Sequence, residues 1–277
     1  MNTLDSIVDR YAVMGHPIQH SKSPRIHNAF AQQFGLRIEY TALDVTPESF
    51  ASEVERFNMS GGKGLNITVP LKELAWGLVQ TRSPQAELAG AVNTLKFNGD
   101  SIAGFNTDGI GLIRDITVNK KTVLTEKDIL LLGAGGAVRG VLLPLLEQAP
   151  TRVVIANRTF ARARELVDRF HGYGNISASG FEGIKDQHFD VVINGTAASL
   201  QGEVPPLPEA LFNPDALAYD MMYSDQDTAF MAWASVHGAI HVSDGLGMLV
   251  EQAAESFSLW RGVQPNTAPV MKMLRAA

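Results

Sequence analysis

The sequence contains no cysteine among its 277 residues, so it can form neither a disulfide framework nor a thiolate metal site. Basic residues are also scarce, because 23 Lys and Arg stand against 29 Asp and Glu, a formal net charge of -6. Nucleic-acid binding depends on clustered Lys and Arg, so a protein that neutralises many phosphates is not expected. A small anionic molecule remains compatible with a local group of donors.

The sequence also lacks an uninterrupted apolar run that could span a membrane. The run ILLLGAGGAVRGVLLPLL is interrupted by Arg139 and Pro144, and the N-terminal MNTLDSIVDRY has no apolar core of signal-peptide length. We therefore expect a cytoplasmic protein with no membrane partner. An apolar fraction of 45% over this length allows one large domain or two ordinary ones.

Strand and helix patterns alternate along the first part of the chain. Strand patterns occur in YAVMGHPI and IEYTALDV, and helix patterns occur in SPRIHNAFAQQFG and PESFASEVERFN. In the first helix we expect Ser23 as the N-cap and Pro24 as the first residue. Ile26, Phe30 and Phe34 should share its apolar face. The alternation predicts an α/β fold with a parallel or mixed sheet covered on both faces.

The stretch GLNITVPLKE, residues 64–73, alternates apolar and polar side chains and predicts a half-buried strand. Asn66 and Thr68 fall on its polar face, and Lys72 follows its end. An ammonium group is strongly hydrated, so two interpretations stay open at this point. Lys72 is either a solvated strand end or a positioned functional group.

A second domain is predicted to begin near Asp108. Before it, TLKF and SIAGF flank the turn signal Asn98-Gly99-Asp100 and predict a hairpin. After it, KDILLLGAGGAVRG joins a buried strand to glycines, and apolar strands follow in TRVVIANRT, FDVVINGT and LAYDMMY. This order predicts a Rossmann-type dinucleotide-binding domain. The last helix is predicted in DGLGMLVEQAAESFSLWRG, with Gly262 as its stop.

The glycine loop after the first strand of this domain matches a phosphate-binding turn in part. Gly133 allows a tight turn, and Gly135 lets the backbone approach a pyrophosphate at a helix N-terminus. Val138 replaces the third glycine of the GxGxxG pattern. We therefore expect Ala137 to be the small residue that packs the helix against the sheet.

The end of the next strand indicates NADP as the cofactor. An NAD site would place an acidic residue there, but this chain has Asn157, Arg158, Thr159 and, one turn later, Arg162. Arginine binds a 2′-phosphate through bidentate, charge-assisted hydrogen bonds. The alternative is a basic helix start on a solvated surface, which the helix dipole disfavours. No metal is expected.

Four polar segments are candidates for a substrate site: HSKSP, the stretch with Asn66 and Thr68, GAVNTL and GFNTDG. Each one alone fits a turn, a cap or a solvent-facing position. Together they offer hydroxyls, amides, one lysine and one carboxylate, which suit a small polyhydroxylated acid. A Lys and an Asp brought together can act as an acid/base pair on a carbonyl or an alcohol.

Eight ordered motifs resemble those of the shikimate dehydrogenase family: YAVMGHPIQHSKSPRIHN, LNITVPLKE, AGAVNTL, FNTDGIG, LLGAGGAVRG, ANRT, DMMY and DGLGMLVEQA. The resemblance covers essentially the whole chain. It implies the NADPH-dependent reduction of 3-dehydroshikimate to shikimate, a step of aromatic amino-acid biosynthesis. It also implies a substrate-binding domain from residues 1–107 and 245–277, and an NADP-binding Rossmann domain from residues 108–244.

The resemblance implies roles for individual residues wherever the motif letters agree. Lys72 and Asp108 match the catalytic pair. The positions expected to contact the substrate are Ser21, Ser23, Asn66, Thr68, Lys72, Asn93, Asp108, Tyr223 and Gln252. The positions expected to contact NADP are Gly133, Ala134, Gly135, Gly136, Ala137, Asn157, Arg158, Thr159, Arg162, Thr196, Met221, Gly245 and Met248.

Two departures from the family pattern concern loops. His16 stands where the family often has Asn, and NGTAAS places Gly195 and Ala197 where Asn-Ala-Thr-Ser is commoner. We expect these changes to alter loop packing near the cofactor. Both residues of the matched catalytic pair, Lys72 and Asp108, are present.

Two alternative functions stay open at this point. The first is a quinate/shikimate dehydrogenase that uses NAD, against which Arg158, Thr159 and Arg162 argue. The second is a non-catalytic module that senses NADP or a metabolite, against which the presence of both Lys72 and Asp108 argues. A monomer and a homodimer are equally compatible with the sequence.

Overall fold

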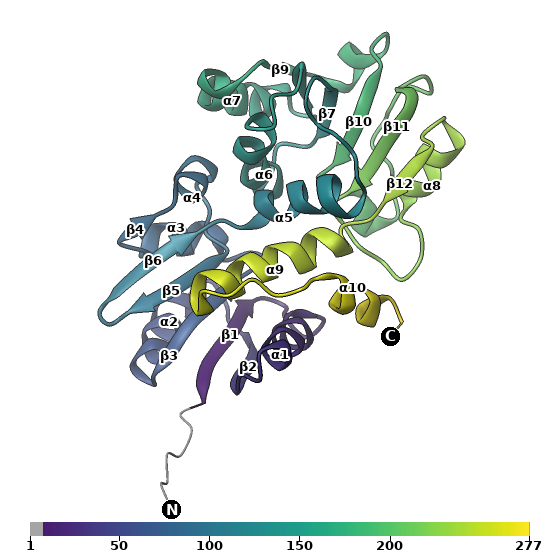
Figure 1. The fold of residues 1–277 in the computed structure, drawn as a ribbon. Coiled ribbons are helices and arrows are strands. Elements are labelled where there is room, and N and C mark those ends of the chain that lie inside the picture. Colours follow the sequence, from purple (N-terminus) through teal and green to yellow (C-terminus); the bar gives the residue numbers. More distant parts are fainter. Residues whose placement is uncertain (1–7, 277) are drawn as a thin grey trace, which may run out of the picture. The chain divides into compact units, whose positions relative to one another are not determined.

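The computed structural model describes residues 8–276, which form two α/β units (Figure 1). Unit 1 consists of Met1–Thr107 and Gln252–Ala277, and unit 2 of Asp108–Glu251. The first seven residues of the expected substrate domain, and Ala277, lie outside the described residues. The chain was expected to return to the first domain at residue 245, whereas the units divide inside helix α9, Leu246–Arg261. The predicted α/β class is confirmed.

Unit 1 is built on a mixed six-stranded sheet with the order β2-β1-β3-β5-β6-β4. Its strands are β1 (Asp9–Gly15), β2 (Ile38–Asp44), β3 (Gly62–Ile67), β4 (Thr81–Arg82), β5 (Thr94–Asn98) and β6 (Ser101–Phe105). β1 pairs in parallel with β2 and β3, whereas β5 is antiparallel to β3 and β6. The predicted hairpin is confirmed, because Asn98 pairs with Ser101 and Gly99 takes a φ of 65° in the turn.

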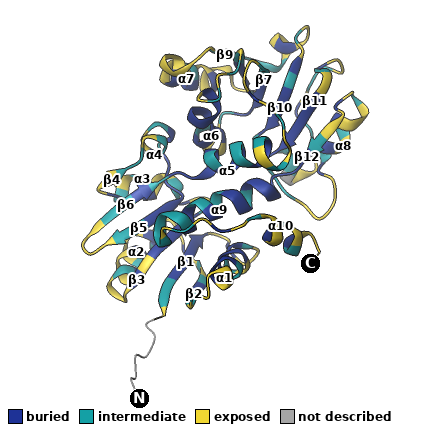
Figure 2. Cartoon of the chain, in the orientation of Figure 1, coloured by how far each residue is buried: buried dark blue, intermediate teal, exposed yellow. Residues whose placement is uncertain are grey.

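The helices of unit 1 are α1 (Ser23–Gln33), α2 (Phe50–Met59), α3 (Lys72–Leu78), α4 (Pro84–Ala89), the C-terminal part of α9, and α10 (Ala268–Arg275). Figure 2 shows the central strands of the sheet as largely buried. Their side chains pack with α2 and α3 in a core that contains Met14, Phe50, Leu65 and Leu71. A separate cluster of Tyr11, Val13, Ile18 and Tyr40 contains the alternate residues of β1, so both faces of this strand are covered, as the alternating strand and helix patterns predict.

The start of α1 differs from the prediction, whereas its apolar face does not. Ser23 is the first residue of the helix, and Lys22 occupies the N-cap position without a side-chain capping bond. The Ser23 hydroxyl is hydrogen-bonded to Tyr40. Phe34 is the C-cap residue and is 40% exposed, but its ring packs against Phe257, as the ring of Phe30 does, so it extends the apolar face formed with Ile26.

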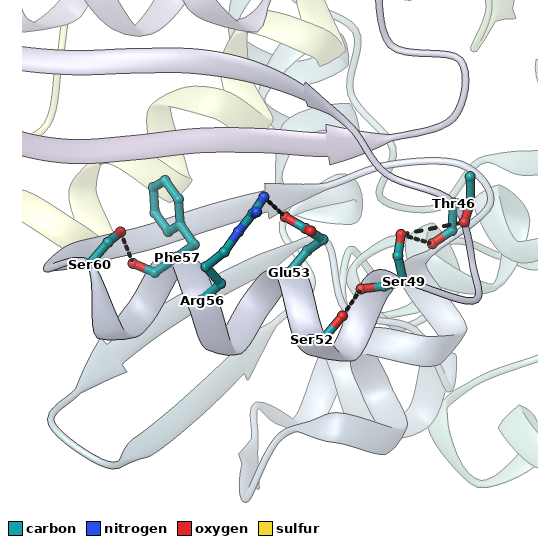
Figure 3. A network of polar contacts seen from close by, with 7 residues as sticks. All are labelled: Thr46, Ser49, Ser52, Glu53, Arg56, Phe57 and Ser60. Carbon is teal, nitrogen blue, oxygen red and sulfur yellow. Dashed lines mark hydrogen bonds and ion pairs between the residues drawn. The ribbon is translucent and has the colours of Figure 1, made fainter.

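The exposed side of α2 carries short local contacts, drawn in Figure 3. The Ser52 hydroxyl donates to the Ser49 carbonyl at 2.9 Å, and Arg56 pairs with Glu53 one turn earlier. Exposed pairs of this kind contribute little, about 0.3–0.5 kcal/mol each. The helix is therefore held mainly by its buried face.

The stretch containing Lys72 does not form the long strand predicted for it. β3 ends at Ile67, and the Leu71 N–H donates to the Thr68 carbonyl at 2.9 Å, which closes a turn. Lys72 is therefore the first residue of α3. Asn66 does not face solvent either, since β3 lies between β1 and β5 and this residue is only 6% exposed. A central strand buries both faces, which alternation alone does not reveal.

His27 lies on the buried face of α1 among aromatic rings. Its imidazole stacks on Tyr40, with centroids 4.3 Å apart and an interplanar angle of 5°. Within residues 8–276 neither ring nitrogen has a hydrogen-bond partner of normal geometry. Burial lowers the pKa of His27 from 6.5 to about 3, and the nearby Asn66 side chain opposes this only in part. The imidazole is therefore neutral in the folded chain at neutral pH.

We predict that His27 makes the folded chain less stable as the pH falls. The unfolded chain takes up a proton at this residue below about pH 6.5, whereas the folded chain does so only near pH 3. Protons therefore favour unfolding between these values, by about 1.4 kcal/mol between roughly pH 7.5 and pH 5.5. His27→Phe should lose about 1.4 kcal/mol less than the wild type over this range in urea unfolding. An equal loss in both proteins would contradict the assignment.

Unit 2 is built on a parallel six-stranded sheet with the order β12-β11-β10-β7-β8-β9. Its strands are β7 (Asp128–Leu132), β8 (Arg152–Ala156), β9 (Ile176–Ser179), β10 (Phe189–Asn194), β11 (Phe212–Asp220) and β12 (His241–Ser243). The order reverses between β7 and β10, which is the arrangement of a doubly wound dinucleotide-binding fold. The predicted Rossmann-type topology is confirmed.

The helices of unit 2 begin with α5 (Asp108–Arg114), which runs into a π-helical turn, η1 (Asp115–Asn119). They continue with α6 (Gly136–Leu146), α7 (Phe160–Phe170), α8 (Ala229–Val236) and the start of α9. The sequence patterns did not indicate β9, which is only four residues long. Within residues 8–276 no helix is long and apolar enough to cross a membrane, and no cluster of His, Asp and Glu is suited to a metal ion.

Candidate active site

Asn66 is the centre of a buried polar network in unit 1. The Tyr40 hydroxyl donates to Asn66 Oδ1 at 2.7 Å, which directs the amide nitrogen to the opposite side. From there Nδ2 donates to Ser256 Oγ at 3.0 Å and to Thr94 Oγ1 at 3.2 Å. Strands β2, β3 and β5 and helix α9 thereby fix one orientation of this amide.

Asn93 forms the second half of the same network. Its Oδ1 accepts hydrogen bonds from the Thr107 N–H and the Thr94 hydroxyl, both at 3.0 Å. Its Nδ2 donates to Thr107 Oγ1 at 3.0 Å and approaches Gln252 Oε1 at 3.5 Å. The Thr94 and Ser256 hydroxyls lie 2.7 Å apart and join the two halves. Three predicted site residues, Asn66, Asn93 and Gln252, are thus held in one cluster.

This cluster lies at one edge of the sheet. Asn66 pairs with Thr94, and Thr94 pairs with Phe105, so the end of β3, the start of β5 and the end of β6 are neighbours. Open α/β sheets bind ligands outside the carboxyl ends of their strands, which is where β3 ends here. The sheet therefore presents its amides and hydroxyls at the edge where a ligand is expected.

Lys72 is anchored to the same edge through its backbone. Its carbonyl accepts a hydrogen bond from the Val92 N–H at 2.9 Å, directly before Asn93. Thr68, directly after β3, donates its N–H to the Met14 carbonyl of β1 at 2.9 Å. The first residue of α3 is therefore tied to the segment that carries Asn93.

Ser21 and Ser23 belong to the loop and helix start that follow β1. The Ser21 hydroxyl accepts a hydrogen bond from the Ser23 N–H at 3.3 Å. The Ser21 N–H donates to the Ile18 carbonyl at 3.0 Å. Through Tyr40, Ser23 is connected to the network around Asn66.

The sequence-based list of site residues omitted four members of the network: Tyr40, Thr94, Thr107 and Ser256. Thr94 lies in the motif AGAVNTL next to Asn93, and Thr107 lies in FNTDGIG next to Asp108. Ser256 follows Gln252 by four residues, so it occupies the same helical face, and that spacing was an available signal. No local pattern distinguishes Tyr40 from any other tyrosine in a strand.

The glycine loop of unit 2 has the geometry of an anion site. Gly133 has a φ of 101°, and its N–H donates to the Ala156 carbonyl at 2.8 Å. Gly135 is the N-cap of α6, and an added Cβ there would meet nothing within 4 Å. The first turn of α6 has no acidic residue, and its leading N–H groups have no partner within the helix. An open loop at such a helix start fits a pyrophosphate group.

Ala137 does not pack the helix against the sheet, contrary to the prediction. Ala137 is exposed, whereas Val138 is fully buried, because successive helical residues point about 100° apart. The space for Val138 comes from a neighbouring loop. A Cβ on Gly195 would lie 2.6 Å from Val138 Cγ2 and 3.1 Å from Met221 Sδ. Gly195 thus accommodates the larger residue that stands in place of the third glycine.

We predict that Gly195→Ala destabilises unit 2 and that Val138→Ala relieves part of this effect. The added methyl group overlaps Val138, and overpacking of this kind costs about 1–3 kcal/mol. Thermal unfolding of both single variants and the double variant gives the coupling between the sites. The double variant should be more stable than the sum of the single effects predicts. Strict additivity would show that the two residues do not compensate each other.

The residues after β8 leave two guanidinium groups available to a ligand. Arg158 and Arg162 are exposed, and within the described part of the chain neither forms an ion pair. Thr159 is the N-cap of α7, but its side chain makes no capping bond, and Asn157 Nδ2 donates to its carbonyl at 2.8 Å. An unused cap hydroxyl beside two unpaired cations fits the 2′-phosphate of NADP.

Thr196, Met221 and Gly245 lie on segments that are held together at the carboxyl edge of the unit 2 sheet. The Thr196 hydroxyl and N–H donate to Asn194 Oδ1 at 2.8 and 3.1 Å. The Gly245 N–H donates to the Met222 carbonyl at 2.8 Å. A Cβ on Gly245 would lie 2.2 Å from the Met221 carbonyl oxygen, so only glycine fits there.

Three further candidates also belong to unit 2. Asp108 is the first residue of α5 and directly follows Thr107 of the polar network in unit 1. Tyr223 lies shortly after β11, where burial raises the pKa of its phenol above the ordinary value of 10.0. The phenol therefore stays protonated at neutral pH and can donate a hydrogen bond. Met248 is a buried residue near the start of α9.

Comparison with protein families covers both units. The family described as shikimate dehydrogenase substrate binding domain matches residues 13–95. The family described as shikimate / quinate 5-dehydrogenase matches residues 116–201, and the shikimate 5′-dehydrogenase C-terminal domain matches residues 245–275. The matches fall in the order that the sequence motifs predicted.

Individual relatives extend this likeness to nearly the whole chain. Shikimate dehydrogenase (NADP(+)) of Alkalilimnicola ehrlichii is 58% identical, over 97% of this chain and 99% of its own length. The crystal structure of an Ael1 enzyme from Pseudomonas putida is 46% identical with a TM-score of 0.92, covering 96% of this chain and 98% of its own. Shikimate 5-dehydrogenase from Thermus thermophilus, solved with NADP(H) and shikimate, is 32% identical with a TM-score of 0.87, covering 97% and 99%. The chain belongs to the shikimate dehydrogenase family.

Proposed function

We propose that this chain catalyses the reversible, NADPH-dependent reduction of 3-dehydroshikimate to shikimate. The observation that carries the proposal is the buried network that joins Asn66, Asn93 and Gln252 beside the start of α3. Fixed amides and hydroxyls at a sheet edge suit a small ligand with several hydroxyl groups, because each substrate hydroxyl needs a partner of defined direction. The relatives named above, from Alkalilimnicola ehrlichii and Thermus thermophilus, support the same reaction.

In this proposal, hydroxyl and amide side chains of unit 1 hold the substrate. Ser21 and Ser23 offer hydroxyls to its carboxylate, and Thr68, Asn66, Asn93 and Gln252 contact its ring hydroxyls. The Tyr40 hydroxyl already orients the Asn66 amide by donating to Oδ1. An amide oxygen can accept two hydrogen bonds, so Oδ1 can accept a second one from a ligand. Orientation before binding reduces the entropy lost when the substrate binds.

The cofactor-binding residues are those of unit 2. NADPH, when bound, supplies the hydride. The loop Gly133–Ala137 would hold its pyrophosphate, and Arg158, Thr159 and Arg162 its 2′-phosphate. Thr196, Met221, Gly245 and Met248 would contact its nicotinamide half.

Lys72 supplies the proton in the proposed mechanism. Its ammonium group donates to the oxygen at C3 as that oxygen gains negative charge, and it stabilises the charge before the proton moves. Asp108 accepts a hydrogen bond from the neighbouring substrate hydroxyl and keeps the substrate in one orientation. In the reverse direction the same lysine takes the proton from the C3 hydroxyl.

Genetic complementation tests the proposed function in a bacterium that lacks its own shikimate dehydrogenase. Expression of the chain should restore growth without added aromatic amino acids, and the Lys72→Ala variant should not. Failure of the wild-type chain to restore growth, although it accumulates as folded protein, would overturn the proposal.

The expected cytoplasmic location and the oligomeric state belong to the same proposal. Subcellular fractionation tests the location. Analytical ultracentrifugation separates a monomer from a homodimer, both of which agree with the sequence.

A further inference from the structure

Asp220 is a fully buried carboxylate at the end of β11 in unit 2. Its Oδ1 accepts hydrogen bonds from Asn194 Nδ2 at 3.2 Å and from the Met222 N–H at 3.1 Å. Its Oδ2 accepts from the Ser199 hydroxyl at 2.6 Å and the Thr228 hydroxyl at 2.7 Å. Four donors, from the last residue of β10 and from the segments after β10 and β11, therefore meet at one side chain, which compensates for its burial.

These bonds determine the orientation of the Asn194 side chain. An ionised carboxylate only accepts hydrogen bonds, so it requires the amide nitrogen of Asn194 to face it. The amide oxygen must then face the other way, where it accepts from the Thr196 hydroxyl at 2.8 Å and the Thr196 N–H at 3.1 Å. The amide nitrogen of Asn194 also donates to Ser199 Oγ at 3.1 Å, and Ser199 is itself bonded to Asp220. Asp220 is thus linked to Thr196 through Asn194 and supports the orientation that Thr196 requires.

The same carboxylate holds the backbone around Met221. The Met222 N–H binds Asp220 Oδ1, and the Met221 N–H donates to the Asn194 carbonyl at 2.9 Å. On the other side the Met222 carbonyl accepts the Gly245 N–H at 2.8 Å. Thr196, Met221 and Gly245, all proposed to contact the nicotinamide half of the cofactor, are therefore tied to one buried charge.

We propose that Asp220 is a positioning residue for the nicotinamide half of NADPH. The inference rests on the proposed function, because the cofactor contacts of Thr196, Met221 and Gly245 are part of it. Asp220 itself need not touch the cofactor. It acts by holding the loop after β10 and the loop after β11 in one arrangement. A neutral amide at this position would both donate and accept, so it would allow other hydrogen-bond patterns. The residues at the 2′-phosphate, after β8, do not depend on Asp220.

The test compares two ligands that share the 2′-phosphate but differ in the nicotinamide half. NADPH and adenosine 2′,5′-bisphosphate are titrated into the full-length wild type and into Asp220→Asn. The substitution keeps the shape of the side chain, but it adds N–H donors where four donors already point. NADPH binding should weaken about 10-fold, as expected when bonds to a charged group are lost. Binding of adenosine 2′,5′-bisphosphate should change by less than about two-fold.

Two further variants keep the test decisive. Asp190→Asn is the matched control, since Asp190 lies near the opposite end of β10 and accepts from the Asp128 N–H at 2.8 Å. It should leave both affinities unchanged. If Asp220→Asn does not fold, Ser199→Ala removes one donor to Asp220 and one acceptor of Asn194 Nδ2, and it should weaken NADPH binding selectively by a smaller factor.

The outcomes separate this inference from the proposed function. Equal weakening of both ligands, or no selective effect on NADPH in either variant, would overturn the positioning role of Asp220. Absence of NADPH binding by the wild type would instead overturn the proposed function. These results are distinct because the titrations require no substrate.

Discussion

Replacing Lys72 by alanine should lower the turnover of shikimate by about 10²-fold or more while leaving NADP binding intact. The variant lacks the ammonium group that supplies the proton and stabilises charge on the C3 oxygen. The NADP contacts are assigned to other residues, all of them in unit 2, so cofactor affinity should not change. Steady-state kinetics with shikimate and NADP, together with a cofactor titration, measure both effects. Unchanged turnover would remove Lys72 from the mechanism.

Two companion variants show what Lys72 does. Lys72→Arg keeps the positive charge but holds its proton far more tightly, because the pKa of a guanidinium lies well above that of an ammonium group. It should therefore remain as impaired as Lys72→Ala if proton transfer is essential, and recover in part if charge stabilisation is sufficient. Lys63→Ala is the matched control, since Lys63 is an exposed lysine in the first half of β3. Turnover by Lys63→Ala should equal that of the wild type.

Replacing Arg158 and Arg162 together by alanine should lower kcat/KM for NADPH by about 10²-fold and leave kcat/KM for NADH unchanged. Each guanidinium is expected to make a charge-assisted bond to the 2′-phosphate worth about 1.5–3 kcal/mol. NADH has no 2′-phosphate, so it loses nothing. The wild type should prefer NADPH, and its preference for NADH would contradict the cofactor assignment.

Arg164→Ala is the control for this double variant. Arg164 lies on the same helix, α7, but its Nε is 3.0 Å from Asp168 Oδ1, and it is an exposed residue. Its removal should leave the preference between NADPH and NADH unchanged. Equal losses with both cofactors in the Arg158 and Arg162 variant would indicate damage to α7 rather than loss of a phosphate contact.

The Rossmann topology of unit 2 could be predicted from the sequence because its signals are local. Each buried parallel strand is a short apolar run, and the glycine loop after β7 marks the point where a helix must follow. The hairpin at Gly99 was predictable for the same reason, since two residues specify its turn. Short elements such as β9 lack enough residues to establish a period.

The polar network of unit 1 could not be predicted because its partners are distant in sequence. Asn66 bonds to Ser256 across 190 positions, and Asn93 approaches Gln252 across 159. Alternation in GLNITVPLKE leaves open whether Asn66 faces solvent or a ligand, and the central position of β3 buries it. The motif likeness identified Asn66, Asn93 and Gln252 as candidates, but not the hydroxyls that orient them.

The packing of α6 shows the same limit at a smaller scale. The glycine pattern suggested Ala137 as the small packing residue, because Val138 is too large for the third glycine position. Val138 fits because Gly195, which follows β10, has no side chain at the position that Val138 occupies. Such compensation between separate loops depends on three-dimensional contact and leaves no local signal.

One measurement tests the central claim most directly: the rate at which the purified chain forms NADPH from NADP in the presence of shikimate. The assay is followed by the absorbance of NADPH, with parallel reactions that contain quinate or that replace NADP with NAD. We predict steady turnover with shikimate and NADP, and much lower rates in both parallel reactions. The account would be contradicted if folded protein that binds NADP formed no NADPH in the presence of shikimate.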